Sequence, residues 1–408
     1  MEYSTIELPN GLRIVHKNVT SMVAHCAITI NAGSRDELPK EHGLAHFIEH
    51  TIFKGTKKRH SHHVLSYMEN VGGEINAYTT KEETCIFGSF THKHYERWFN
   101  LLSDIVFNSS FPERELEKEK DIIIDEINSC KDNPSEQIYD DFEDLIFRGH
   151  PLGRSILGTP QNLKLFKLEH ISAFLVRNYL PGQMVISSVG QIPFSSLVRL
   201  VEKYFGTVET GGGSQKRQRF DGYVPESKTV KRRNHQSHCI IGGTAYEATN
   251  AKKAALVLLN NVLGGPGLNS RLNMSVREKN GYCYNIDSHY HPFTDTGIFC
   301  IYFGTDAEYL EKTLELVHKE LKKFRELTLG TLQLKRAKQQ LSGQVAISLE
   351  SNLNEMLSMG KSTLIYNKID SIEEINRKIE AVTANELLEV ANEIFDAKKL
   401  SVLSYNPR

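Results

Sequence analysis

Two histidines and a glutamate within five consecutive residues are the part of this sequence that could most directly perform chemistry. The run HFIEH at residues 46–50 lies in a segment, residues 43–53, whose apolar residues recur with a helical period. Residues four apart share one helix face, so the imidazoles of His46 and His50 can reach a single metal ion. Imidazole nitrogen and carboxylate oxygen suit Zn²⁺, whose catalytic sites leave one position open for water. The pattern indicates a metal site that needs another ligand from elsewhere in the chain.

Chance is the alternative explanation, because 17 histidines in 408 residues make a pair at this spacing unremarkable. The cluster His60, His62 and His63 illustrates the point, and we interpret it as solvated surface. For the first pair, a glutamate-rich segment further along the chain favours a metal site.

That segment, residues 112–127, follows two serines and begins with a proline and a glutamate, which is typical of a helix start. Most of its acids suit a solvated helix face. Glu119 and Glu126, however, are seven residues apart and therefore share a face. Glu126 follows His50 by 76 residues.

The elements that must position these residues occur twice along the chain. The first half is expected to contain strands over 6–15 and 24–30, a helix around residue 46, a strand pair over 74–90 and long helices from residue 94. The second half repeats this order with a strand over 238–245, a helix over 252–263, strands over 283–290 and 297–304, and helices from residue 307. Between them, residues 210–219 have the glycine-rich and then basic composition of a linker. We infer the duplication of one α+β unit.

Several segments together resemble one family. The motif H-x-x-E-H is the inverzincin signature. The chain is similar to the zinc metallopeptidase family of pitrilysin, insulysin and mitochondrial processing peptidase in LPNGLRIV, NAGSRDE, HGLAHFIEHTIFKGT, GGEINAYTTKEET, HPLGRSILGT, LGGPGLNSRL and VREKNGYCY, which follow the family's order. Its length resembles that of the small, dimer-forming, two-domain subgroup.

The resemblance implies an α+β fold of two homologous domains, each a mixed or antiparallel sheet packed against helices. We expect a catalytic domain over residues 1–209, a linker over 210–223, and a second domain over 224–408 without a metal site. The first helix expected in that second domain, residues 254–263, contains no histidine or glutamate. We therefore expect one Zn²⁺ per chain, although similar ligands also accept Mn²⁺ or Co²⁺.

Residue by residue, the resemblance implies that His46, His50 and Glu126 are zinc ligands and that Glu49 is the catalytic base. Glu119 matches the family's second glutamate. Its carboxylate is a plausible acceptor for the N–H of a ligand imidazole, which would fix the orientation of that ring. Considered alone, Glu119 is also compatible with a solvated helix acid, which is the less favoured interpretation.

Two further pairs match positions at which the family binds substrate. Asn76 and Ala77 lie in a segment expected to form an edge strand, which can accept an extended peptide through main-chain hydrogen bonds. Arg277 and Tyr284 match an arginine and a tyrosine, seven apart, that the family places opposite the zinc, where they can bind a carbonyl or an oxyanion. Without the family, the first pair indicates an ordinary strand end and the second a helix end followed by a strand.

The composition of the chain limits the classes of binding partner and the cellular compartment that we expect for the protein. The 49 basic and 50 acidic residues give a net charge of −1, which argues against a nucleic-acid partner. No apolar run approaches membrane-spanning length, and no secretory signal is evident. The six cysteines show no C-x-x-C spacing, so we expect buried, reduced thiols and a cytoplasmic protein.

The sequence thus predicts a zinc-dependent endopeptidase that acts on short extended peptides inside the chamber of a homodimer. Two alternatives remain: a non-catalytic scaffold subunit, and a processing peptidase that depends on a metal-free partner. The chain carries both the metal motif and the Arg277/Tyr284 pair, which favours a self-sufficient enzyme.

Overall fold

The computed structural model describes residues 3–210 and 216–408. Two compact units are formed by segments that alternate along the chain. The first unit comprises Met1–Asn128, Arg154–Arg217 and Ser348–Ile369, and the second comprises Ser129–Gly153, Gln218–Ile347 and Asp370–Arg408. Residues 211–215 of the predicted linker lie outside the described residues.

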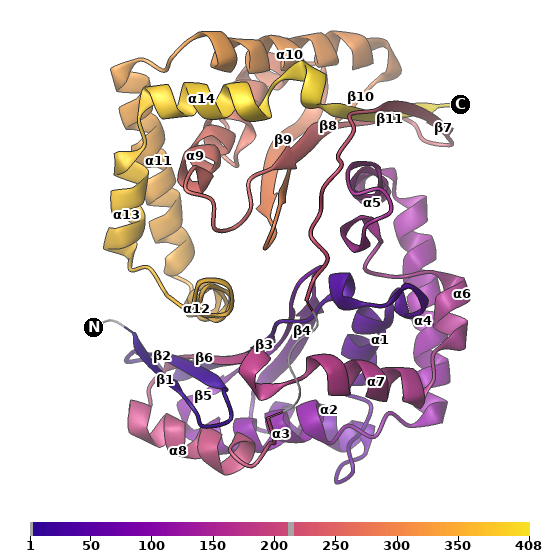
Figure 1. Cartoon of the computed structure of the whole chain (residues 1–408), viewed down its shortest axis with the longest axis vertical. Coiled ribbons are helices and arrows are strands. Elements are labelled where there is room, and N and C mark those ends of the chain that lie inside the picture. The colour runs from indigo at the N-terminus through magenta and orange to yellow at the C-terminus, as the bar shows by residue number, and fades with distance from the viewer. Residues whose placement is uncertain (1–2, 211–215) are drawn as a thin grey trace. The chain divides into compact units, whose positions relative to one another are not determined.

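A six-stranded sheet forms the centre of the first unit, in the order β1-β2-β6-β3-β5-β4 (Figure 1). Its strands are β1 (Ser4–Glu7), β2 (Arg13–Asn18), β3 (Val23–Ile30), β4 (Glu74–Thr79), β5 (Thr84–Thr91) and β6 (Met184–Gly190). Only the β2–β6 pair is parallel. All seven residues of β6 are buried, because both faces of the sheet are covered.

The second unit contains a five-stranded sheet in the order β7-β11-β8-β10-β9. Its strands are β7 (Ser227–Arg232), β8 (Ser237–Ala245), β9 (Cys283–Pro292), β10 (Gly297–Thr305) and β11 (Ser401–Pro407). Again one pair, β11 with β7, is parallel. Apart from β1, the two sheets connect their strands in the same order, which supports the inferred duplication and confirms the α+β class.

In the first unit the sheet separates two layers of side chains. One face joins a large apolar core with residues of the surrounding helices, including the fully buried Trp98, Phe47 and Phe174. These helices are α1 (Leu44–Thr51), α2 (Ser61–Glu69), α3 (Tyr95–Phe107), α4 (Glu113–Asp132), α6 (Pro160–Leu165), α7 (Leu168–Asn178) and α8 (Phe194–Phe205). The other face is covered by α12 (Asn352–Tyr366), whose Met356 and Met359 pack on β2, β3 and β6.

The second unit repeats this layering. One face of its sheet packs against α9 (Lys253–Gly264), α10 (Leu310–Glu326), α11 (Thr331–Leu349), α13 (Ile372–Ala381) and α14 (Ala384–Ile394). The opposite face is covered by α5 (Pro134–Ile146), whose Ile138 and Phe142 join residues of β8, β10 and β11 in a separate apolar cluster. Each sheet is therefore covered on one face by a helix from the other half of the sequence.

Several predictions of local structure are confirmed. The expected helices and most expected strands form, with boundaries that differ by a few residues. The segment 6–15 is an exception, because a turn with Gly11 at φ +84° separates the end of β1 from the start of β2. Five of the six cysteines are buried thiols, as expected, whereas Cys130 is half-buried. The predicted linker arginine Arg217 is not simply solvated, since its guanidinium is held by Asp36 in the first unit. Within the described ranges, no helix has the length and apolarity needed to cross a membrane.

The fit of α12 on its sheet gives a first prediction. A Cβ atom at Gly360 would lie 2.7 Å from Thr29 Oγ1 and 2.9 Å from Ser187 Oγ, whereas one at Gly343 in α11 would meet no atom within 4 Å. Gly360→Ala should lower the free energy of unfolding by about 1–3 kcal/mol through overpacking. The matched change Gly343→Ala should raise it by about 0.5–1 kcal/mol through helix propensity. Denaturant-induced unfolding measures both, and equal effects would contradict the close packing of α12.

Candidate metal and catalytic site

The helix that carries the H-x-x-E-H run begins at a tight glycine contact. Gly43, immediately before α1, has φ +95°, a left-handed conformation that favours glycine. A Cβ atom there would lie 2.7 Å from the Cα atom of Gly158, which also has a positive φ. The segments around these two glycines, distant in sequence, therefore meet backbone to backbone and fix where α1 starts.

Glu37 completes the start of α1. Its Oε2 accepts a hydrogen bond from the Gly43 N–H at 2.9 Å, and its Oε1 accepts one from the Ala45 N–H at 2.8 Å. These bonds satisfy backbone donors that lack a partner within the helix. Glu37 is only 4% exposed, and burial raises its pKa to about 8 although the two bonds and Arg154 act in the opposite direction. Nothing in the sequence marked this residue apart from its place in the NAGSRDE segment.

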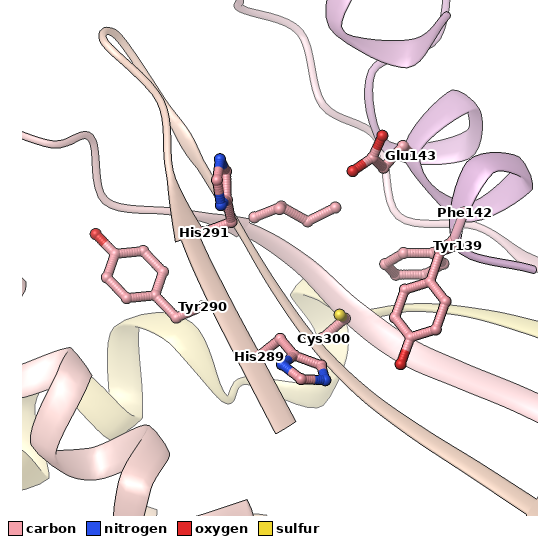
Figure 2. A pocket seen from close by; sticks show the side chains of 8 residues that line it. Tyr139, Phe142, Glu143, His289, Tyr290, His291 and Cys300 are labelled. Carbon is pink, nitrogen blue, oxygen red and sulfur yellow. The ribbon is translucent and has the colours of Figure 1, made fainter. Parts of the chain in front are cut away.

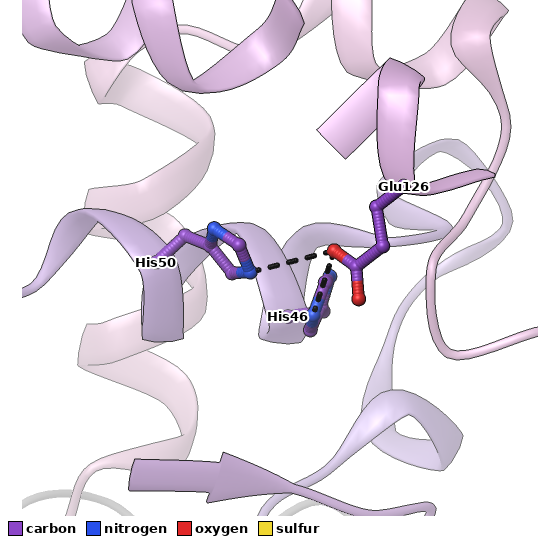
Figure 3. A group of neighbouring side chains, drawn as sticks. All are labelled: His46, His50 and Glu126. Carbon is purple, nitrogen blue, oxygen red and sulfur yellow. Dashed lines mark ion pairs between the residues drawn. The ribbon is translucent and has the colours of Figure 1, made fainter. Parts of the chain in front are cut away.

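The structure brings His46, His50 and Glu126 together (Figure 3). Glu126 Oε2, from α4, lies 3.8 Å from His46 Nε2 and 3.6 Å from His50 Nε2. The two imidazole centroids are 4.5 Å apart. Among the described residues, this is the one group of three histidine, cysteine or acidic side chains whose ligand atoms all lie within 4.8 Å of one another.

The donors of this group fit a zinc ion. Two imidazole nitrogens and one carboxylate oxygen form the N/O set that zinc prefers at catalytic sites. Burial, and then the neighbouring His50, lower the pKa of His46 to about 4, so this imidazole is neutral and its lone pair is available. His46 Nδ1 is buried and has no hydrogen-bond partner within the described part of the chain.

Glu119 lies on the other side of His50. Its Oε2 is 3.2 Å from His50 Nδ1, and the residue is only 3% exposed. A carboxylate at this position favours the tautomer with the proton on Nδ1, which leaves the Nε2 lone pair directed toward Glu126. This is the contact that was expected of Glu119 if it were more than a solvated helix acid.

Glu49 lies on α1 between the metal-ligand candidates and the edge of the sheet. Burial raises its pKa, while Thr79 and His50 act in the opposite direction. Thr79 is the last residue of β4, and β4 is an edge strand that pairs only with β5. The carboxyl group is therefore close to a strand edge that is unpaired among the described strands.

The first predicted substrate-binding pair lies on an edge strand, and the second is divided between a short helix and an edge strand. Asn76 and Ala77 are in β4, where Asn76 is exposed and Ala77 half-buried. In the second unit, Arg277 is in a short π-helix (Asn273–Glu278), and Tyr284 is in β9. The Arg277 guanidinium carbon is 5.4 Å from the centroid of the Tyr284 ring, and Tyr284 is 84% exposed. The structure thus brings Arg277 and Tyr284 together.

A pocket of about 390 Å³ occurs separately in the second unit (Figure 2). Cross-strand pairing sets His289 opposite Cys300 and His291 opposite Ile298, so these side chains project from one face of the sheet. Figure 2 shows Glu143 on the facing helix, α5. The pocket's donors do not converge as those of the first site do. The lining residues are Tyr139, Phe142, Glu143, His289, Tyr290, His291, Ile298 and Cys300.

Comparison with known sequences identifies matches in both halves. Residues 13–160 match the model described as insulinase (peptidase family M16), and residues 166–341 match the model described as peptidase M16 inactive domain. The chain is 32% identical to an uncharacterized zinc protease of Bacillus subtilis, over 95% of this chain and 94% of that protein. It is 31% identical to an uncharacterized zinc protease of Streptomyces coelicolor, over 97% and 88% of the two chains.

Solved structures share the fold. The crystal structure of a protease from Helicobacter pylori superimposes with a TM-score of 0.92 at 21% identity and covers 99% of each chain. A Pseudomonas fluorescens structure described as a peptidase M16 inactive domain has a TM-score of 0.94 at 20% identity, covering 100% of this chain and 98% of that one. At these identities the likeness concerns the fold alone.

The histidine geometry predicts the metal content of variants. If the three converging side chains bind zinc, His50→Ala removes one of them, and the purified protein should contain far less zinc than the wild type. His62→Ala, which removes an exposed histidine, should keep the wild-type zinc content. Elemental analysis after dialysis measures both, and a full equivalent of zinc in His50→Ala would exclude this residue as a ligand.

Proposed function

The chain belongs to the insulinase family, peptidase family M16, as its motifs predicted, and on this premise we propose that it is a zinc-dependent endopeptidase that hydrolyses short, extended peptides. The observation that carries the proposal is the convergence of His46, His50 and Glu126, with Glu49 on the same helix as the two histidines. One such group among the described residues supports one zinc ion per chain.

His46, His50 and Glu126 would hold the zinc ion, which would supply Lewis acidity toward water and a peptide carbonyl. Glu49 accepts a proton from the water molecule that attacks the carbonyl carbon, and it then delivers that proton to the leaving amine. Its half-buried position beside the site suits both transfers. Glu119 holds His50 in one tautomer throughout.

The edge strand β4 provides the surface for substrate. An extended peptide that pairs with β4 would be bound through main-chain hydrogen bonds. Because every peptide has the same main chain, this binding would place few demands on the sequence of the substrate. In this arrangement Asn76 and Ala77 contact the peptide, and the end of the strand at Thr79 brings the scissile bond toward Glu49. A stably folded protein presents no free extended segment and would be spared.

Arg277 and Tyr284 complete the proposal. A guanidinium and a phenol O–H close together can bind a substrate carbonyl and the oxyanion that develops from it. We propose that two chains form a homodimer around a chamber in which this pair serves the zinc site of the other chain. The six free thiols are compatible with a reducing compartment, and we propose a cytoplasmic location.

The role of Glu49 can be separated from metal binding. Glu49→Gln keeps the size of the side chain but removes the base, so turnover should fall by about 10²- to 10⁴-fold. Zinc content and peptide binding should remain. Glu69→Gln, at an exposed position in α2, is the matched control and should behave as the wild type. Cleavage of a quenched fluorescent peptide measures turnover, and a near-normal rate of Glu49→Gln at full zinc occupancy would refute the assignment.

Completion of the site between chains is tested by mixing two impaired variants. Glu49→Gln has an intact Arg277/Tyr284 pair but lacks the base, and Arg277→Ala has the reverse defect. In a mixed dimer, completion between chains regenerates one wild-type site, whereas completion within a chain regenerates none. Activity should therefore rise well above that of either parent once subunit exchange is confirmed by mass spectrometry. No gain in confirmed mixed dimers would contradict the arrangement.

A further inference from the structure

Lys54 extends the chain of contacts behind the metal-ligand candidates. It follows α1 by three residues and was not singled out in the sequence, although it belongs to the FKGT part of a family-like segment. Its Nζ lies 2.5 Å from Glu119 Oε1, and the other oxygen of that carboxylate lies 3.2 Å from His50 Nδ1. On the far side of the ring, His50 Nε2 is 3.6 Å from Glu126 Oε2. One carboxylate therefore joins an ammonium group to the back of a ligand imidazole.

The contact between Lys54 and Glu119 matters because Glu119 is buried. A buried carboxylate is costly unless its oxygens have partners, and here each oxygen faces one: Lys54 on Oε1 and His50 on Oε2. Two partners on opposite oxygens fix the carboxylate in its own plane as well as in position. A carboxylate held only by His50 would be free to rotate about that single contact.

Lys54 differs in this respect from an ordinary surface lysine. Its side chain is only 26% exposed, so the ion pair is less screened by water than the exposed pairs that contribute little to stability. Another acid of α4, the half-buried Glu115, is paired instead with Lys118 at 2.7 Å. Glu119 is thus the acid that Lys54 contacts directly.

We propose that Lys54 is a positioning residue that holds Glu119, and through it the His50 imidazole, in the orientation required for binding zinc. This inference rests on the proposed function, because it assumes that His50 is a zinc ligand. Lys54 itself touches neither metal nor substrate. Its contribution should therefore appear in metal affinity rather than only in overall stability.

The experiment measures the Zn²⁺ affinity of the metal-free protein by competition with a chromogenic chelator. Loss of a group that supports a metal ligand typically weakens binding 10- to 100-fold, and for Lys54→Met we expect about tenfold. Lys54→Arg, which restores a cation that can reach Glu119, should recover most of the affinity. Lys58→Met, which changes an exposed lysine four residues away, should bind zinc as the wild type does.

A double-mutant cycle separates positioning from general destabilisation. In a Glu119→Ala background, Lys54→Met should cause little further loss of affinity, because its only route to His50 is gone. Thermal unfolding of each metal-free variant identifies proteins that are simply unstable. If Lys54→Met folds poorly, Lys54→Gln keeps a hydrogen-bond donor and should show a smaller loss in the same direction.

The outcomes distinguish this proposal from the one on which it rests. A wild-type protein that binds no zinc would overturn the proposed function itself. Tight binding by the wild type together with unchanged affinity in Lys54→Met would overturn only the role of Lys54. An equal loss from Lys54→Met with and without Glu119 would also overturn it, because the effect would then not pass through that carboxylate.

Discussion

The contact between His50 and Glu119 is the interaction on which the geometry of the site depends. The three ligand candidates come from two helices, α1 and α4, that are separated by more than sixty residues of chain. The Glu119 carboxylate on α4 contacts Nδ1 of the His50 imidazole on α1, and this contact helps to hold the two helices in a fixed relative position. Glu37 and the Gly43–Gly158 contact then fix the start of α1. These protein contacts hold the ligand candidates in place, which a metal site requires if its ligands are to bind with little loss of binding energy.

The sequence revealed those parts of the site that depend on local spacing. His46 and His50 are four residues apart, and helical periodicity alone places them on one face. Glu126 could be assigned only through the family resemblance, because its distance in sequence says nothing about its position in space. Glu37 and Lys54 escaped notice because an acid or a lysine in a loop is ordinarily solvated. What distinguishes them is the burial of Glu37 and the contact of Lys54 with the buried Glu119, which are properties of the folded chain.

The sequence also did not show which helix packs on which of the two sheets, because that too depends on the folded chain. The amphipathic pattern of α5 shows that this helix buries one face, but it does not show against which sheet. The pattern of α12 is weaker, since its buried face includes Glu355 and Thr363. In the structure α5 packs on the second sheet and α12 on the first, so each half of the sequence contributes to the other unit's core. A division at the linker, such as the one expected over residues 210–223, describes the duplication of the sequence. The compact units instead follow the packing.

The edge strands of the two sheets add support to the assignment of a substrate surface. Exposed strand edges invite unwanted pairing, and proteins commonly protect them with charged residues, especially lysine. The edge strand β7 follows this rule with Lys228, Lys231 and Arg232. In contrast, β4 has the sequence EINAYT, with a single charge at its start and none beside Thr79, and the other edge strand of that sheet, β1, also has a single charge in STIE. Because the end of β4 at Thr79 lies close to the half-buried Glu49, and Glu49 lies on the same helix as two of the three metal-ligand candidates, this strand edge supports the proposal that an extended chain pairs with β4.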